Sequence, residues 1–417
     1  DFEPSAGKDV RLALDIGVQQ FVTEILRMGN SEPVDMASAE VQRAIANDRD
    51  LKLHLASGEN MLLRDSLGRI TPPESGAVVV MDVRTGEVIS MVSSPTYDPN
   101  IFTERLLTRD WRRLQEHPRN PLLNRVTAGA YAPGSTFKMV VALAALEAGI
   151  ISEKTRHFCN GSMDLGNRTF HCWFEDGHGS MNVIKALERS CDVFFYEVAL
   201  KTGIQRIKNM ALRLGLGFPT GIDIPGEKPG IIPSHDWKLA THGVVWTPGE
   251  TVNAGIGQGY VLTTPLQLAV MIARLANAEL AVTPSLQVLD SPPAFEPLDI
   301  SPAALRTIRK GMFQVTHGGL GTARAHNLSS SLGGMAGKTG TVQVKRITKE
   351  QREDGITKNI ERPWKERDHA LFVGYAPVKN PRYAVSVVVE HGGSGSSMAA
   401  PIARATLQRV LQTRDMA

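Results

Sequence analysis

The sequence predicts an α+β fold whose antiparallel sheet is built from both ends of the chain. β-rich runs occur near each terminus, at residues 77–92 and 370–390, and helical patterns lie between them. The long apolar runs that are typical of parallel strands are missing. Strands at both ends with helices between them favour an α+β arrangement.

The first expected element is an amphipathic helix that runs from Asp15 to about Leu26. Asp15 can cap its first turn, and apolar residues recur at steps of three and four. We expect this helix to lie on the sheet. Its apolar positions are Val18, Phe21, Val22, Ile25 and Leu26.

The segment that follows, at about 27–73, is mixed and polar, with a helical pattern only near 38–46. It fits an insertion or accessory lobe better than core. We therefore expect one domain over residues 9–417 that contains this lobe, preceded by a linker remnant at 1–8. Because the chain begins with Asp1 rather than Met, we also expect a natural N-terminal segment, such as an anchor, to precede it.

A hairpin and a helix are expected next. Residues 77–83 and 87–92 are β-rich and are joined through Arg84, Thr85 and Gly86, which predicts a hairpin. The chain then becomes rich in loops up to Pro133. Residues 139–146 form an apolar helical run, and Gly149 suits the end of that helix.

Three strands are expected near the C-terminus, at residues 337–344, 370–376 and 383–390. The turn-forming pair Asn380-Pro381 separates the last two strands. These strands complete the sheet that the N-terminal hairpin begins.

Composition excludes several classes of protein. The chain has 417 residues, of which 42% are hydrophobic and 21% charged, as in a globular protein. Its net charge of +3, from 46 basic and 43 acidic residues, gives no basis for nucleic-acid binding. No run approaches the ~18–20 apolar residues of a membrane span.

The first chemical motif is Ser135-Thr136-Phe137-Lys138, which opens the predicted helix. Residues three apart lie on one helix face, so the Lys138 amine can reach the Ser135 hydroxyl. A serine hydroxyl becomes nucleophilic when a nearby base takes its proton, and a desolvated lysine can be that base. Taken alone, the spacing also fits a capped helix with a solvated lysine.

Two further motifs follow in order. Ser190-Cys191-Asp192 lies in the middle of the chain, and Lys338-Thr339-Gly340-Thr341 lies near its end. Taken alone, Asp192 could be a helix cap, and Lys338 could protect the edge of a sheet. Three such motifs in this order are hard to obtain by chance.

The three motifs together resemble those of the penicillin-binding proteins and serine β-lactamases. The resemblance implies the transpeptidase fold of that superfamily, an antiparallel sheet flanked by helices with an all-helical subdomain. Within that superfamily the chain is similar to class B penicillin-binding proteins, and most to the penicillin-binding protein 2 group of elongation transpeptidases. The resemblance covers the chain from about Lys8, apart from residues 27–73. It is supported by the stretches 247–260 (T-P-G-E-T-V-N-A-G-I-G-Q-G-Y), 264–267 (T-P-L-Q) and 390–393 (E-H-G-G). Asp192 stands where many relatives have Asn, a departure that penicillin-binding protein 2 shares.

The resemblance implies a role for each motif residue. Ser135 would attack the penultimate D-Ala carbonyl of a stem peptide, and Lys138 would accept its proton. Ser190 would pass a proton to the leaving D-Ala, held by Lys138 and Lys338 and oriented by Asp192. The substrate carboxylate would bind at Lys338 and the strand after it, and an oxyanion hole would use the N–H groups of Ser135 and Thr341. The substrate-binding residues of that strand are Thr339, Gly340 and Thr341.

The resemblance also implies a setting. It predicts a periplasmic domain of an inner-membrane-anchored protein that acts on peptidoglycan stem peptides and is acylated by β-lactam antibiotics. A membrane glycosyltransferase and elongation-complex proteins are the expected partners, and the chemistry needs no cofactor. A D,D-carboxypeptidase or β-lactamase, in which water resolves the acyl-enzyme, and a β-lactam sensor without turnover remain alternatives.

The three cysteines, Cys159, Cys172 and Cys191, lie in one short window with His178. Together these four residues could bind a structural zinc ion with three thiolates and one imidazole. A disulfide between Cys159 and Cys172, or three buried thiols, are the alternatives. Some proteins that resemble penicillin-binding protein 2 carry a metal beside the active site. Nearby residues that compete as ligands are His157, Asp164, His171 and Asp176, whereas Trp173, Trp237 and Trp246 receive no role.

Overall fold

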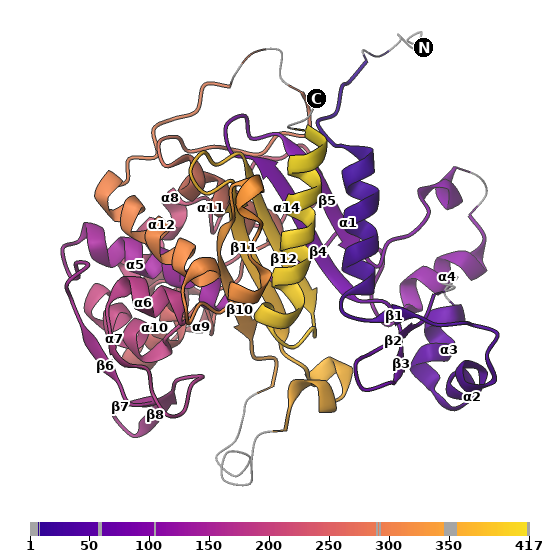
Figure 1. Cartoon of the computed structure of the whole chain (residues 1–417), viewed down its shortest axis with the longest axis horizontal. Coiled ribbons are helices and arrows are strands. Elements are labelled where there is room, and N and C mark those ends of the chain that lie inside the picture. Colours follow the sequence, from indigo (N-terminus) through magenta and orange to yellow (C-terminus); the bar gives the residue numbers. More distant parts are fainter. Residues whose placement is uncertain are drawn as a thin grey trace.

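A five-stranded antiparallel sheet forms the centre of the computed structural model, which describes residues 7, 9–56, 61–103, 106–288, 291, 293–345 and 357–414 (Figure 1). Its strand order is β10-β11-β12-β4-β5. The N-terminal strands are β4 (Ser75–Asp82) and β5 (Val88–Ser94). The C-terminal strands are β10 (Ala336–Val342), β11 (His369–Ala376) and β12 (Tyr383–Glu390). The predicted sheet, built from both chain ends, is confirmed. Apart from Gly7, the expected linker remnant at 1–8 lies outside the described residues.

Strand β4 shows why this sheet is apolar on both faces. Val78 and Val80 contribute to one hydrophobic cluster and Val79 and Met81 to the other, as the two-residue period of a strand requires. The β4–β5 turn depends on Gly86, which has a φ of +77°. A Cβ there would lie 2.0 Å from the Thr283 carbonyl oxygen.

Two terminal helices cover one face of the sheet, as Figure 1 shows. The first, α1 (Ile16–Met28), begins as predicted, because the Asp15 carboxylate accepts a 3.0 Å hydrogen bond from the Val18 N–H. The second, α14 (Ala400–Arg414), was not expected from the sequence. It packs on β11 and β12 and closes the apolar face beside α1.

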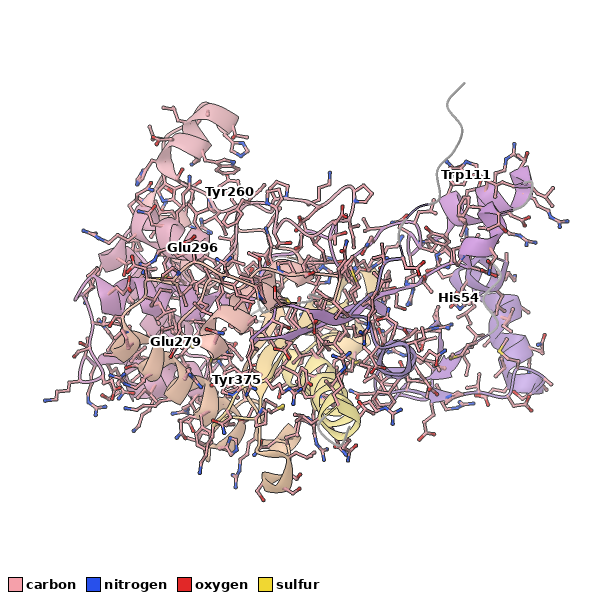
Figure 2. The ribbon with its side chains drawn as sticks, turned by 90° about the horizontal axis from the view of Figure 1, so that it is seen from above. His54, Trp111, Tyr260, Glu279, Glu296 and Tyr375 are labelled. Atoms are coloured by element: carbon pink, nitrogen blue, oxygen red, sulfur yellow. The ribbon has the colours of Figure 1, made fainter. Side chains whose placement is uncertain are left out.

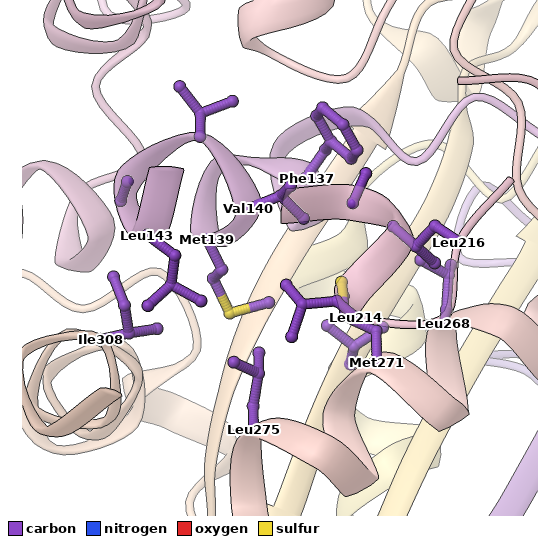
Figure 3. Close-up of a cluster of buried hydrophobic side chains, with 14 of the residues drawn as sticks. Phe137, Met139, Val140, Leu143, Leu214, Leu216, Leu268, Met271, Leu275 and Ile308 are labelled. Atoms are coloured by element: carbon purple, nitrogen blue, oxygen red, sulfur yellow. The ribbon is translucent and has the colours of Figure 1, made fainter. Parts of the chain in front are cut away.

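The opposite face carries α11 (Pro265–Asn277) and a mainly helical subdomain (Figure 1). The predicted helix after Ser135 is present as α5 (Lys138–Glu147), and Gly149 follows it with a φ of +67°. Figure 3 shows Met139 and Leu143 of α5 in the apolar cluster that also contains Met271 of α11. The other helices of this part are α6 (Val183–Glu188), α7 (Asp192–Thr202), α8 (Ile204–Arg213), α9 (His235–His242), α10 (Pro248–Gly255) and α12 (Pro302–His317).

The helical subdomain was expected to be all helix, but it also contains two small antiparallel sheets. One pairs β6 (His157–Cys159) with β9 (Gly179–Met181), and the other pairs β7 (Ser162–Leu165) with β8 (Arg168–His171). These strands are only three or four residues long, which is too short for a clear alternating pattern in the sequence. They bring the cysteine window into one compact unit.

Residues between α1 and β4 form a separate group of short elements with their own apolar cluster around Val41, Leu51 and Leu62. Figure 2 shows His54 of this group at the same end of the molecule as Trp111 of α4 (Thr108–Glu116). Helix α2 includes the helical pattern expected near 38–46. The elements are β1 (Glu32–Pro33), α2 (Ala39–Asn47), α3 (Arg49–Ala56), β2 (Leu63–Arg64) and β3 (Ile70–Thr71).

Membrane-spanning helices are not found within the described ranges, since none of the helices there combines the length and the apolarity that a span requires.

Candidate active site

Ser135 lies on a 3-10 turn, Gly134–Phe137, that leads directly into α5. Gly134 has a φ of +53°, and a Cβ there would lie 3.0 Å from the Thr341 carbonyl oxygen. Its N–H donates to Gly257 O at 2.9 Å. The nucleophile candidate is thereby held between β10 and the loop after α10. Ser135 is half-buried, and within the described part of the chain its hydroxyl makes no hydrogen bond.

Lys138 is fully buried one turn after Ser135. Its Nζ donates to Asp192 Oδ1 at 2.7 Å and to Ser190 O at 2.8 Å, and it lies 3.2 Å from Ser190 Oγ. An ammonium group has three donors, and all three point to the 190–192 turn. The structure therefore joins the first two motifs through one side chain.

Lys338 approaches the same serine from the sheet. It is fully buried in β10, and its Nζ donates to Ser190 Oγ at 2.9 Å and to Thr339 O at 3.0 Å. Burial lowers the pKa of Lys338 well below its ordinary value, and the positive charge of Lys138 lowers it further, whereas Asp192 opposes this shift. Ser190 Oγ thus accepts hydrogen bonds from two lysines, and its own hydroxyl proton can be donated to a further acceptor.

The turn that carries Ser190 and Asp192 is conformationally unusual. Ser190 has a φ of +55°, a left-handed conformation that costs a non-glycine residue about 1–3 kcal/mol. Asp192 is buried, and burial raises the pKa of its carboxyl group, while Lys138 opposes that rise. Neither feature could be read from the sequence.

The substrate-binding candidates follow Lys338 along β10. The Thr339 hydroxyl lies 2.7 Å from that of Thr322, and the Thr341 side chain is exposed, with its hydroxyl accepting from Gly395 N at 3.4 Å. A Cβ at Gly340 would lie 3.1 Å from the Thr136 methyl group, so this glycine lets the strand approach the nucleophile turn. Sequence reasoning missed Thr322, because no motif marks it.

The four predicted metal ligands also come together. Cys159, Cys172, His178 and Cys191 are buried, and their ligand atoms all lie within 4.8 Å of one another. His178 Nδ1 lies 3.4 Å from Cys172 Sγ and 3.7 Å from Cys159 Sγ. All three cysteines are free thiols, so the alternative disulfide between Cys159 and Cys172 is not formed. A hydrogen bond from Cys191 lowers the pKa of the Cys172 thiol, which favours the thiolate.

The competing ligands lie elsewhere or have other partners. His157 bonds through Nδ1 to the Glu197 carboxylate, and the Asp164 carboxylate accepts from the Thr169 hydroxyl at 2.6 Å. Neither His171 nor Asp176 belongs to the group of four ligand atoms found among the described residues. The three serine-site motifs and the cysteine group therefore form two adjoining clusters that share the 190–192 turn.

Comparison with known proteins identifies the family. Residues 76–408 match the family model described as the penicillin binding protein transpeptidase domain. The chain belongs to this family. The family match begins within β4 and ends within α14, so it contains all of the central sheet except Ser75, together with all three serine-site motifs.

The chain is also similar to named proteins over most of its length. It is 34% identical over 423 residues to the peptidoglycan D,D-transpeptidase MrdA of Haemophilus influenzae, covering 98% of this chain and 57% of that protein. A crystal structure of Pseudomonas aeruginosa PBP2 in complex with WCK 5153 matches with a TM-score of 0.76 and 35% identity, covering 99% of this chain and 77% of that one. Thus the penicillin-binding transpeptidase fold is confirmed.

A third relative is a complex. The Helicobacter pylori complex between penicillin-binding protein PBP2 and MreC matches with a TM-score of 0.74 and 26% identity, covering 94% of this chain and 78% of that one. The chain spans a little over half the length of MrdA from H. influenzae. The resemblance to the penicillin-binding protein 2 group is confirmed by these matches.

Proposed function

We propose that the chain is a peptidoglycan D,D-transpeptidase that forms an acyl-enzyme at Ser135. The observation that carries this proposal is the position of the Ser190 hydroxyl, which lies within 3.2 Å of the amines of both Lys138 and Lys338. Such an arrangement can move a proton between an attacking hydroxyl and a leaving amine. The name of the H. influenzae relative supports the same activity.

In the proposed reaction, Lys138 acts in its unprotonated form, and its amine takes the Ser135 Oγ proton as that oxygen attacks the penultimate D-Ala carbonyl. The tetrahedral oxyanion would be stabilised by the backbone N–H groups of Ser135 and Thr341. The peptide C–N bond then breaks as Ser190 donates a proton to the departing D-Ala nitrogen and is reprotonated from the lysines. An amine of a second stem peptide attacks the acyl-enzyme, returns a proton by the same route and releases Ser135.

The strand after Lys338 is the proposed carboxylate site. Lys338 contributes an amine donor, and Thr339 and Thr341 present hydroxyl groups beside the nucleophile turn, while Gly340 allows the close approach. A D-Ala-D-Ala terminus and a β-lactam both carry a carboxylate next to the bond that is broken. Both would therefore bind in the same orientation.

Fluorescent penicillin tests this assignment. We expect covalent labelling of the wild-type chain, and we expect none when Ser135 is replaced by alanine, because the ester to its oxygen cannot form. The matched control is Ser66→Ala, at an exposed serine of a turn, which should label like wild type. Labelling that survives Ser135→Ala would refute the assignment.

The fate of the label separates the related activities. A transpeptidase should keep the penicilloyl group for hours in the absence of an acceptor amine. Rapid release of hydrolysed penicillin would instead assign a D,D-carboxypeptidase or a β-lactamase. A stable label without any cross-linking of lipid-linked substrate, when a partner polymerase is present, would assign a β-lactam sensor.

We also propose the cellular location, domain boundaries and partner proteins that the resemblance implies. The chain would be the periplasmic part of an inner-membrane-anchored protein, with residues 9–417 as the transpeptidase domain and about 27–73 as an accessory lobe. A membrane glycosyltransferase and elongation-complex proteins would be its partners. The complex of H. pylori PBP2 with MreC supports this proposal.

We further propose that a structural zinc ion binds Cys159, Cys172, His178 and Cys191. Two thiolates on one zinc ion lie roughly 3.8 Å apart, which agrees with four buried ligand atoms within 4.8 Å of one another. Three sulfurs and one imidazole nitrogen form a ligand set that zinc prefers. With four protein ligands the ion would have no open position, so it would stabilise the fold and leave the chemistry to Ser135.

Elemental analysis tests the zinc proposal. We expect one zinc per chain in protein purified without chelator, and less than a tenth of that in Cys159→Ser/Cys172→Ser. Removal of zinc should lower the melting temperature, because ligand binding to the folded state stabilises it. Absence of zinc together with a titration of only one free thiol would instead favour the disulfide.

A further inference from the structure

We propose that Trp173 is a positioning residue that holds the Ser190 turn for proton delivery to the leaving group. This inference rests on the proposed acyl transfer at Ser135. Sequence reasoning assigned Trp173 no role, because an aromatic residue most often only packs. In the structure its hydrogen bonds, rather than its ring, make the decisive contacts.

Trp173 meets three acceptors of the catalytic turn. Its indole Nε1–H points between Arg189 O and Ser190 O, with both distances 3.1 Å. Its backbone N–H donates to Asp192 Oδ2 at 2.9 Å. Trp173 alone therefore binds three groups of this turn: the Arg189 carbonyl, the Ser190 carbonyl and the Asp192 carboxylate.

Two of these groups, the Ser190 carbonyl and the Asp192 carboxylate, also accept hydrogen bonds from Lys138. Lys138 Nζ donates to Ser190 O and to Asp192 Oδ1, so the amine and Trp173 together hold the Ser190 carbonyl and the two Asp192 carboxylate oxygens. Ser190 needs such restraints because its φ of +55° is unfavourable for a residue with a Cβ. The orientation of the Ser190 hydroxyl toward both lysines follows from this held backbone.

The exposure of the Trp173 side chain argues against an ordinary core role. The side chain is 58% exposed, although its Nε1 is directed at the protein. Its ring lies beside Phe174 and His178, with centroid distances of 5.7 and 5.5 Å. A phenylalanine could keep most of these ring contacts but could not donate to the two carbonyls.

Other contacts hold the turn when that donor is lost. The Arg189 side chain donates to His178 O at 3.2 Å, and Asp192 N donates to Cys172 Sγ at 3.4 Å. The protein should therefore fold without the indole N–H. What should change is the position of the Ser190 hydroxyl, and with it the step in which a leaving nitrogen takes a proton.

The kind of leaving group distinguishes this role from a general structural one. A β-lactam or amide nitrogen must be protonated as the C–N bond breaks, whereas a thioester expels a thiolate that needs no proton. We expect Trp173→Phe to slow acylation by benzylpenicillin about tenfold. We expect less than a twofold change for an acyl-D-alanyl thioester.

The control is Phe158→Leu, a change at the exposed aromatic residue just before Cys159, and it should alter neither rate. If Trp173→Phe folds poorly, replacement of Trp173 by benzothienylalanine removes only the N–H and should give the same selective loss. Equal slowing of both substrates, or of neither, would overturn the inference. Failure of the wild-type protein to react with benzylpenicillin would instead overturn the proposed function.

Discussion

Replacing Lys138 with methionine is expected to slow acylation of Ser135 by a β-lactam about 10⁴-fold, the upper range for loss of a general base. It is also expected to destabilise the fold. Lys138 forms a 2.7 Å ion pair with Asp192 in a buried position, and removing one partner of such a pair typically costs about 3–5 kcal/mol. Stopped-flow acylation and denaturant unfolding measure the two effects separately.

A second change separates catalysis from stability. In Lys138→Met/Asp192→Asn both buried charges are absent, so most of the lost unfolding free energy should return. Acylation should remain as slow as in the single variant, because no amine lies one turn after Ser135. Recovery of acylation in the double variant, or a wild-type rate in Lys138→Met, would show that another group takes the proton.

The second large effect is a loss of stability, and we expect it on replacement of Glu390, at the end of β12. Its carboxylate lies 3.0 Å from the buried Arg125 Nε and accepts a 2.8 Å hydrogen bond from the Tyr131 hydroxyl. Burial and the adjacent carboxylate raise the pKa of Tyr131 well above its ordinary value, so this hydroxyl stays a donor. Glu390→Ala should lower the free energy of unfolding by about 3–5 kcal/mol, because Arg125 loses its buried counter-charge.

The matched control is Glu366→Ala, which removes an exposed ion pair with Lys345 at 2.9 Å. Exposed pairs contribute about 0–1 kcal/mol, so the control should unfold nearly as wild type does. Equal unfolding free energies for the two variants would contradict the assigned importance of Glu390. Because Tyr131 lies four residues before Ser135, acylation by penicillin should also slow in Glu390→Ala.

The sheet could be predicted because its signals are local. Runs of β-branched residues mark β4 and β12, apolar and aromatic residues mark β11, and the Asp15 cap marks the start of α1. Helix α14 was missed because several of its buried residues are small or polar, namely Ala400, Ala403 and Thr406, which weakens the apolar pattern. The two small sheets of residues 157–181 were missed because their strands are too short.

The sequence predicted which residues belong to the candidate site, but it did not predict how they are arranged in space. Order and spacing brought Ser135, Ser190 and Lys338 together as candidates, and the structure places both lysine amines at the Ser190 hydroxyl. The left-handed Ser190 and the hydrogen bonds of Trp173 depend on tertiary contacts that no local pattern encodes. The only sequence signal for Trp173 was its place beside Cys172.

The strand order β10-β11-β12-β4-β5 has a consequence for how the active site forms during synthesis. The β4–β5 hairpin emerges from the ribosome early, but its inner neighbour β12 begins only at Tyr383. Until then one edge of β4 lacks its strand partner, and Lys338 has no sheet to hold it beside Ser190. Such long-range pairing slows folding, so chain segments made first must wait for those made last. Truncation before β12 should therefore yield an aggregation-prone chain rather than a weakened enzyme.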